Sequence, residues 1–256
     1  HRDLHSFPTR RSSDLRRYPN PLGQPFREAA AEVLGVRPAM ILCGNGADDV
    51  INVIIRAIAG AGRPIVAPTP TYTLVETLAE LHRTPLITMP FCEGGGLPIA
   101  GLVLSPGAMV YVVNPNPPTG TRVDVDAMGE LADRIEGVLV VDEAYVDFAD
   151  GDCLSLAKSR PNVLVVRTLS KGYSLAGLRF GYAVGDPALI AGLIKAKDSY
   201  NVDALSVAAA TAAIRDQAYF KANVARIRVQ RTRVTAALRA MGFAVGDSQT
   251  NFLLAA

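Results

Sequence analysis

MVYVVN (109–114), GVLVVDE (137–143) and NVLVVRT (162–168) are the stretches of sequence that decide the fold. Each is a short β-branched run that is apolar on both of its faces. Such runs are typical of strands covered on both sides, as in a parallel sheet. A helical pattern at 124–136 separates the first two runs. Strands that alternate with helices predict an α/β fold with a doubly wound, mostly parallel sheet.

The same alternation continues on both sides of these runs. Apolar residues recur at helical spacing in DDVINVIIRAIAG (48–60), which predicts a buried helix face. The chain ends in TNFLLAA (250–256), which we expect to begin one more strand. No internal repeat is visible. Further strands are expected at 39–44, 64–68, 84–90 and 178–185, and further helices at 71–82, 187–197, 203–215 and 216–241.

Composition excludes several classes of protein. The chain has 256 residues, of which 49% are hydrophobic and 20% charged, so disorder of the whole chain is excluded. The 26 basic and 24 acidic residues leave a net charge of +2, which does not favour nucleic acid as a partner. The apolar runs are shorter than the roughly 20 residues of a membrane helix. Three scattered cysteines favour free thiols in a reducing, cytoplasmic setting over disulfides or a zinc site.

The first fifteen residues, HRDLHSFPTRRSSDL, do not fit the rest of the chain. They lack the apolar core of a secretory signal, and their acidic residues argue against a transit peptide. Residues 5–15 resemble one reading frame of a sequencing adapter. We therefore expect 1–15 to be a non-native tail and the native start of the chain to be missing; a genuine mobile arm is the alternative.

The segment TLSKGYSLAGLR (168–179) combines groups that suit a phosphate and an aldehyde. It contains the hydroxyls of Thr168 and Ser170, the amine of Lys171 and the guanidinium of Arg179. A guanidinium binds phosphate oxygens in a bidentate manner, and a lysine amine can condense with an aldehyde. Taken alone, however, a loop lysine is most often a solvated side chain.

The pattern S-K-x-x-x-x-A-G-x-R in this segment resembles the cofactor-lysine motif of the fold-type I pyridoxal-phosphate aminotransferases. The block VVDEAYVDF (140–148) resembles the family's strand end beside the cofactor ring. The resemblance implies that Lys171 is catalytic, that Asp142 meets the ring nitrogen and that Tyr145 binds the phenolic oxygen. A carboxylate at that nitrogen keeps it protonated, so the ring accepts electrons from the substrate. Standing alone, Asp-Glu after a strand would be an ordinary turn.

Two further blocks follow the order of the family. CGNGADD (43–49) resembles its phosphate-binding turn, where Ala47 and Asp48 would present backbone N–H groups at a helix start. We also expect Asp48 to cap that helix. PTPTYT (68–73) places Tyr72 where the family stacks an aromatic ring on the cofactor. Neither G-x-G-x-x-G nor G-x-x-x-x-G-K-[ST] occurs, so nicotinamide and nucleotide-triphosphate sites are not supported.

Two blocks depart from the family or depend on a partner subunit. In NPNPPTG (114–120), Pro117 stands where the family often has an asparagine that binds the phenolic oxygen, and proline has no donor to offer. We expect Asn116 to take this role, and a cis bond between the two prolines. RYPNP (17–21) resembles the segment whose tyrosine reaches the phosphate of the neighbouring subunit. This resemblance implies a homodimer in which Tyr18 acts in trans.

The resemblance covers 16–256 and is strongest to histidinol-phosphate aminotransferases. It implies an exchange of the amino group between histidinol phosphate with 2-oxoglutarate and imidazole-acetol phosphate with glutamate. It also implies a cofactor-binding large domain at 16–220 and the start of a truncated small domain at 221–256. The arginine that binds the substrate carboxylate is expected beyond Ala256, so we expect this piece to lack turnover. The alternatives are an aromatic transaminase, a phospho-amino-acid decarboxylase and the ligand-sensing module of a regulator.

Overall fold

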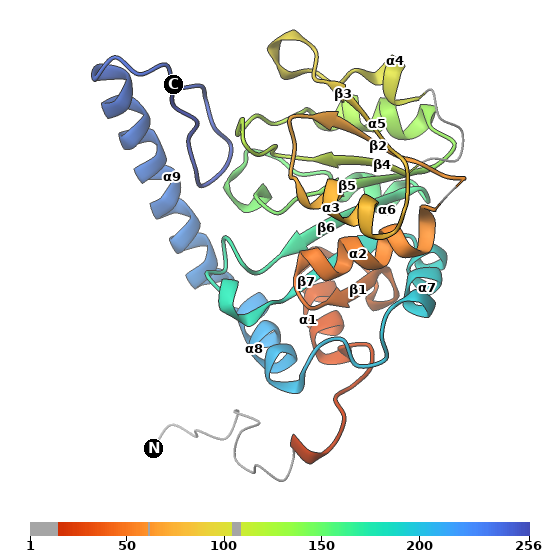
Figure 1. Ribbon diagram of the computed structural model, residues 1–256. Coiled ribbons are helices and arrows are strands. Elements are labelled where there is room, and N and C mark those ends of the chain that lie inside the picture. The colour runs from red at the N-terminus through yellow and green to blue at the C-terminus, as the bar shows by residue number, and fades with distance from the viewer. Residues whose placement is uncertain (1–14, 61, 104–108) are drawn as a thin grey trace, which may run out of the picture.

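The computed structural model describes residues 15–60, 62–103 and 109–256. The adapter-like stretch therefore lies outside the described residues, except for Leu15. In the described part, seven strands form one sheet in the order β1-β7-β6-β5-β4-β2-β3 (Figure 1). The strands are β1 (Ile41–Gly44), β2 (Ile65–Thr69), β3 (Leu86–Pro90), β4 (Met109–Val113), β5 (Val138–Asp142), β6 (Val163–Thr168) and β7 (Gly181–Gly185).

The three runs that predicted the fold form the centre of this sheet. β4, β5 and β6 are parallel neighbours, and their residues are buried almost throughout. Alternate side chains of each strand enter different apolar clusters: Val110 and Val112 pack on one face, Met109 and Tyr111 on the other. The prediction of strands covered on both faces is therefore confirmed.

Helices cover both faces of the sheet. One face packs against α2, α3 and α7, and the opposite face packs against α1, α4, α5, α6 and α8. These two layers follow from the apolar side chains that each helix presents to the sheet. The helices are α1 (Gln24–Leu34), α2 (Ala47–Ile58), α3 (Leu74–Leu81), α4 (Ile99–Leu102), α5 (Val125–Arg134), α6 (Leu154–Ser159), α7 (Pro187–Ala196), α8 (Ala204–Arg215) and α9 (Gln217–Ala240).

The sheet is mostly parallel, as predicted, with one exception. β7 runs antiparallel to both of its neighbours, β6 and β1. It can do so because only the short loop around η6 (Ala176–Leu178) joins it to β6, whereas a parallel neighbour would need a long crossover.

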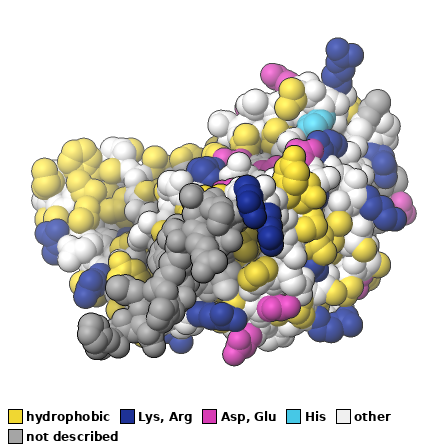
Figure 2. Space-filling view, turned by 90° about the horizontal axis from the view of Figure 1, so that it is seen from below, with side chains coloured by type: hydrophobic (Ala, Val, Ile, Leu, Met, Phe, Trp, Pro, Cys, Tyr) yellow, Lys and Arg dark blue, Asp and Glu magenta, His cyan; other side chains and the backbone are white. Residues whose placement is uncertain are grey.

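The C-terminal part of the chain differs from the rest in its exposure. α9 runs along one side of the molecule, and the expected domain boundary at 220/221 falls inside this helix (Figure 1). Its only fully buried residue is Val224, whereas Val229 is 64% exposed. Hydrophobic side chains also gather at the left of Figure 2, the side on which α9 lies, while basic and acidic groups are interspersed over the rest of that face.

The expected strand in TNFLLAA does not form. Only one antiparallel bridge, between Val245 and Ala255, is present there. A strand requires a neighbour along its length, and this segment has one only at its end. Within the described residues, no helix has the length and hydropathy that would let it cross a membrane.

Candidate functional site

A cavity of about 220 Å³ lies at the carboxyl ends of β4, β5 and β6, where the first turn of α2 meets them. Ligands of open α/β sheets bind at this edge because the loops there converge. Of the residues singled out in the sequence, all but Asn116 and Tyr18 line the cavity. The lining residues are Ala47, Asp48, Tyr72, Val113, Pro117, Asp142, Ala144, Tyr145, Thr168, Ser170, Lys171, Ala176 and Arg179.

Asp142 is the buried carboxylate of this cavity. It ends β5 and is 2% exposed. The hydroxyl of Tyr111 donates to one carboxylate oxygen at 2.6 Å, and the backbone N–H of Ala144 donates to the other at 3.0 Å. Burial raises the pKa of Asp142, and these two hydrogen bonds oppose the rise. Among the described residues no cation contacts this carboxylate directly, so a protonated nitrogen in the cavity would satisfy it.

Tyr111 was not singled out in the sequence, although a signal for it exists. In β4 it lies two residues before Val113, which pairs with Asp142 in the sheet register. Residues two apart on a strand point to the same face, so Tyr111 shares the face of Asp142. A tyrosine at that spacing indicates a hydroxyl partner for the carboxylate.

Glu143 points away from the cavity, although it follows Asp142 directly. Its carboxylate accepts from Arg167 at 2.8–2.9 Å and from the backbone N–H of Cys153. Burial raises the pKa of Glu143, and the positive charge of Arg167 opposes that rise. Glu143 is thus part of a buried ion pair behind the strand, which leaves Asp142 as the carboxylate available to a ligand.

Hydroxyls and a guanidinium gather at one end of the cavity. The hydroxyl of Thr168 donates to that of Ser170 at 3.0 Å, and Arg179 reaches Ser170 at 3.4 Å. Arg179 also contacts the carboxylate of Asp48 at 3.2 Å. Its backbone has φ +52°, a strained conformation for a residue with a side chain. This arrangement of donors suits a phosphate group.

The first turn of α2 closes the same end of the cavity. Gly46, with φ +86°, is the N-cap of α2, and no side chain caps the helix. The expectation that Asp48 caps it is therefore wrong, because Asp48 lies inside the first turn and pairs with Arg179. An uncapped helix start presents free backbone N–H groups and a positive dipole end to an anion.

Lys171 and two tyrosines form the remaining walls. The amine of Lys171 lies 5.1 Å from the centre of the Tyr145 ring. Tyr145 makes an edge-to-face contact with Phe252 near the C-terminus, with 5.1 Å between ring centres. Tyr72 is 38% exposed at the cavity mouth; partial burial and the charges of Asp48 and Asp142 raise its pKa.

Asn116 lies beside the cavity but not in its lining. Its amide group donates to the carbonyl of Pro70 at 2.9 Å and to Thr119 at 3.3 Å. The oxygen of this buried amide has no partner within the described part of the chain. Pro117, in contrast, does line the cavity, and the predicted cis bond between Pro117 and Pro118 is confirmed. The role expected of Asn116 stays a prediction.

Tyr18 lies outside the cavity of its own chain. It is 80% exposed and stacks on Tyr200, with 4.5 Å between ring centres. Tyr18 is therefore not part of the lining of its own chain's cavity.

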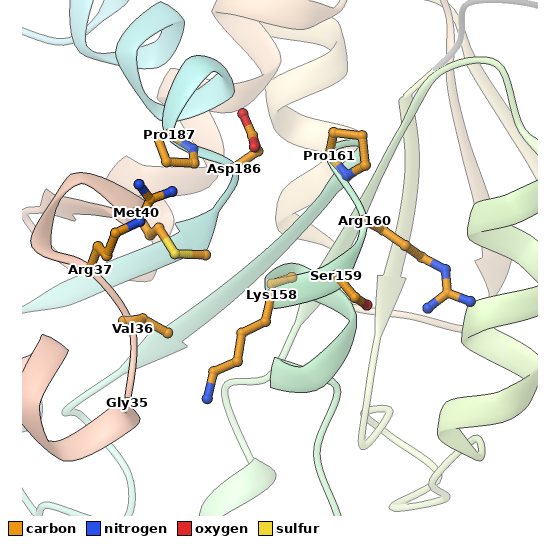
Figure 3. Close-up of a pocket in the computed structure, with 11 residues that line it drawn as sticks. Gly35, Val36, Arg37, Met40, Lys158, Ser159, Arg160, Pro161, Asp186 and Pro187 are labelled. Atoms are coloured by element: carbon orange, nitrogen blue, oxygen red, sulfur yellow. The ribbon is translucent and has the colours of Figure 1, made fainter.

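A larger cavity of about 540 Å³ lies between the end of α1 and the start of α7 (Figure 3). Two of its three basic residues are already engaged: Lys158 donates to the carbonyl of Leu34 at 2.7 Å, and Arg160 binds Asp133 through two 2.8 Å hydrogen bonds. Figure 3 shows these two side chains pointing in different directions. The described residues also contain no cluster of potential metal ligands. The smaller cavity is therefore the better candidate for catalysis.

The chain is similar in sequence to known proteins. The family described as "Aminotransferase class I and II" matches residues 4–256. The chain is 49% identical over 240 residues to a histidinol-phosphate aminotransferase of Nostoc sp., a match that covers 94% of the chain and 68% of that protein. A relative of the same name from Rhodopirellula baltica is 44% identical, with 93% of the chain and 67% of the relative covered.

A solved structure shares the fold. The histidinol-phosphate aminotransferase of Sinorhizobium meliloti, solved in complex with pyridoxal-5'-phosphate, superimposes with a TM-score of 0.85 at 31% identity. The match covers 94% of the chain and 68% of that structure.

Proposed function

Because this chain belongs to the aminotransferase class I and II family, we propose that its cavity binds pyridoxal phosphate and transfers an amino group from histidinol phosphate to 2-oxoglutarate. The products are imidazole-acetol phosphate and glutamate, in a step of histidine biosynthesis. The single observation that carries this proposal is the convergence of Lys171, Asp142 and Arg179 on one cavity.

The residues present fit the cofactor at both of its polar ends. The hydroxyls of Thr168 and Ser170, the guanidinium of Arg179 and the start of α2 supply donors for a phosphate dianion. Asp142 supplies a buried carboxylate, without a cation in contact, for the ring nitrogen.

When bound, pyridoxal phosphate supplies an aldehyde and a ring that withdraws electrons from the substrate carbon. Lys171 lines the cavity, so its amine would hold the aldehyde and, once a substrate amine has displaced it, would accept the proton that leaves the substrate α-carbon. Asp142 holds the proton on the ring nitrogen. Tyr72 and Tyr145 orient the ring, and Pro117 leaves the phenolic oxygen without the usual asparagine donor.

We also infer that the working unit is a homodimer in which Tyr18 completes the phosphate site of the partner subunit. In its own chain Tyr18 is exposed and lies outside the cavity lining, which supports a role in trans. Symmetric dimers with self-complementary interfaces are the commonest oligomers.

The covalent role of Lys171 is tested by incubating the chain with pyridoxal phosphate, reducing with borohydride and mapping the labelled peptide. We expect the label on Lys171 and its loss in Lys171→Ala. Lys158→Ala is the matched control, because its amine is engaged by the Leu34 carbonyl and lies at the other cavity. Preferential labelling of Lys158, Lys195 or Lys197 would refute the assignment.

The substrate is tested in a longer chain that includes the expected remainder of the small domain, by following glutamate formation from 2-oxoglutarate with different amino donors. We expect the highest kcat/KM with histidinol phosphate, well above phenylalanine or tyrosine. Higher kcat/KM with an aromatic amino acid would point to an aromatic transaminase. Release of carbon dioxide from a phosphorylated amino acid would point to a decarboxylase instead.

A further inference from the structure

The loop that carries Lys171 is held at the next residue, Gly172, by a carboxylate. A Cβ atom on Gly172 would lie 2.3 Å from an oxygen of Asp147, so this position has room for glycine alone. The Asp147 side chain thus lies directly against Gly172, on the side where a side chain would otherwise stand. Asp147 lies in η5 (Val146–Phe148), only five residues after Asp142, but it is not among the residues that line the cavity.

The carbonyl of the same glycine is held from the opposite side by helix α9. The amide nitrogen of Asn223 donates to the carbonyl of Gly172 at 3.1 Å and to the hydroxyl of Ser174 at 3.0 Å. Gly172 is therefore held between two side chains that are distant in sequence, Asp147 by contact and Asn223 by a hydrogen bond.

Helix α9 contacts this loop at a second place. Phe220 stacks on Tyr173 with 4.1 Å between ring centres and an interplanar angle of 14°. Gln217 donates to the Tyr173 hydroxyl at 3.0 Å. The contacts of Gln217, Phe220 and Asn223 are one turn apart, so one face of α9 covers residues 172–174.

The loop needs these contacts because its backbone is strained. Ser174 has φ +57°, in the left-handed region that residues with side chains seldom occupy. Such conformations persist only where the surroundings hold them in place. Without Asp147 and Asn223, we expect the backbone after Lys171 to sample other conformations.

We propose that Asp147 and Asn223 are positioning residues, which hold Gly172 from two sides and thereby keep the Lys171 amine aimed into the cavity. This inference rests on the proposed function for the role of Lys171. The same contacts tie the direction of the lysine to the position of α9, since a shift of that helix would pull on the Gly172 carbonyl through Asn223.

The first test measures hydrogen exchange by mass spectrometry in the chain without cofactor. In Asp147→Ala and in Asn223→Ala we expect peptides covering 169–175 to exchange about fivefold faster, which corresponds to the loss of one typical hydrogen bond. Asp147→Asn keeps a side chain of the same size against Gly172, so it should restore most of the protection. Gln230→Ala is the control on the same helix, because Gln230 contacts Arg233 and not the loop.

The second test measures the rate at which pyridoxal phosphate and borohydride label Lys171. We expect Asn223→Ala to lower this rate several-fold, while Gln230→Ala labels like the unmodified chain. Hydrogen exchange of a peptide covering β5 reports whether each variant stays folded. Unchanged exchange at 169–175 in folded Asn223→Ala overturns the proposal, even if Asp147→Ala fails to fold. Failure of Lys171 to label in the unmodified chain overturns the proposed function but leaves the exchange result standing.

Discussion

At the scale of single residues, the site depends on a carboxylate that is buried without a cation in contact. Asp142 is 2% exposed, and burial raises its pKa. The Tyr111 hydroxyl opposes this rise by donating to the ionised form. Tyr111 is itself buried, and burial raises its own pKa well above the usual value, so it stays a donor. This pair keeps Asp142 ready to hold a proton on the nitrogen of a bound ring.

Tyr111→Phe tests this pairing. Because the hydrogen bond from Tyr111 lowers the pKa of Asp142, its removal should raise that pKa. The acid limb of the pH profile of pyridoxal-phosphate affinity should then move to higher pH, which titration of affinity at several pH values measures. An acid limb that stays in place, or moves to lower pH, would show that Asp142 does not control binding.

The titration of Asp147 leads to a separate prediction of how the free energy of unfolding depends on pH. Burial raises the pKa of Asp147 to about 6, while Arg167 and the Gly172 N–H oppose the rise and Glu143 adds to it. A folded-state pKa above the unfolded value favours folding at low pH. The free energy of unfolding therefore falls as pH rises from about 4 to 6, by no more than about 3 kcal/mol from this group.

Asp147→Asn removes this titration. Relative to the unmodified chain, the variant should gain stability between about pH 4 and pH 6, with no further relative gain above pH 7. Urea unfolding at several pH values measures the difference. A stability difference that is constant over this range would mean that the carboxylate titrates at its ordinary pKa.

The residues that the sequence could predict are those that form a linear pattern. Lys171, Arg179 and Asp142 lie in short motifs, and the structure brings them to one cavity. Tyr111 and Asn223 act through contacts with residues far from them in sequence, so no local pattern marks their roles. The geometry of Asn116 also could not be predicted from the sequence, because its amide donates to the carbonyl of Pro70, which is distant in the chain.

At the scale of elements, the phosphate end of the cavity is made by two loops that approach each other closely. Gly46 caps α2 with φ +86°, and a Cβ there would lie 2.7 Å from the guanidinium of Arg179. A side chain at this position would both strain the turn and push Arg179 away from the start of α2. The position therefore links the fold of α2 to the binding of an anion.

Gly46→Ala should lower the free energy of unfolding by about 1–3 kcal/mol, because alanine is strained at this φ. It should also weaken pyridoxal-phosphate binding about tenfold or more, as measured by absorbance titration. Gly192→Ala is the control: Gly192 lies inside α7 with open space around it, so alanine should stabilise the helix by up to about 1 kcal/mol. Equal cofactor affinity in both variants would contradict the role of the turn.

The type of most elements follows from periodicity, but their direction does not. β7 reads as a strand in the sequence, yet nothing in its residues shows that it runs antiparallel to β6. α1 was not predicted, because its buried face consists mainly of alanines around Phe26 and so carries a weak apolar pattern. Packing against α8 and the sheet, which the sequence does not display, stabilises this helix.

At the scale of the whole molecule, two features of the described residues are exposed at the surface of a single chain. One is a groove of about 420 Å³ between α9 and the C-terminal segment, with a mostly apolar lining. The other is Tyr18, which stacks on Tyr200 at the surface. The apolar groove favours association, and we expect the isolated chain to bind a hydrophobic dye in a concentration-dependent way. A sharper prediction can be made for Tyr18, because this residue is proposed to belong to the cofactor site of the partner subunit.

If Tyr18 completes the site of the partner subunit, defects at Tyr18 and Lys171 lie in different sites of a mixed dimer. Tyr18→Phe alone should bind pyridoxal phosphate weakly, and Lys171→Ala alone should show none of the visible absorbance of the lysine-bound cofactor. In a mixed dimer, the Lys171→Ala subunit contributes its Tyr18 to the site of the Tyr18→Phe subunit, which retains Lys171. Random pairing of equal amounts should therefore give about a quarter of all sites high affinity, because half of the dimers are mixed and each has one complete site. Absorbance titration after joint refolding measures this fraction; a mixture that behaves as the average of its two components would show that Tyr18 does not act in trans.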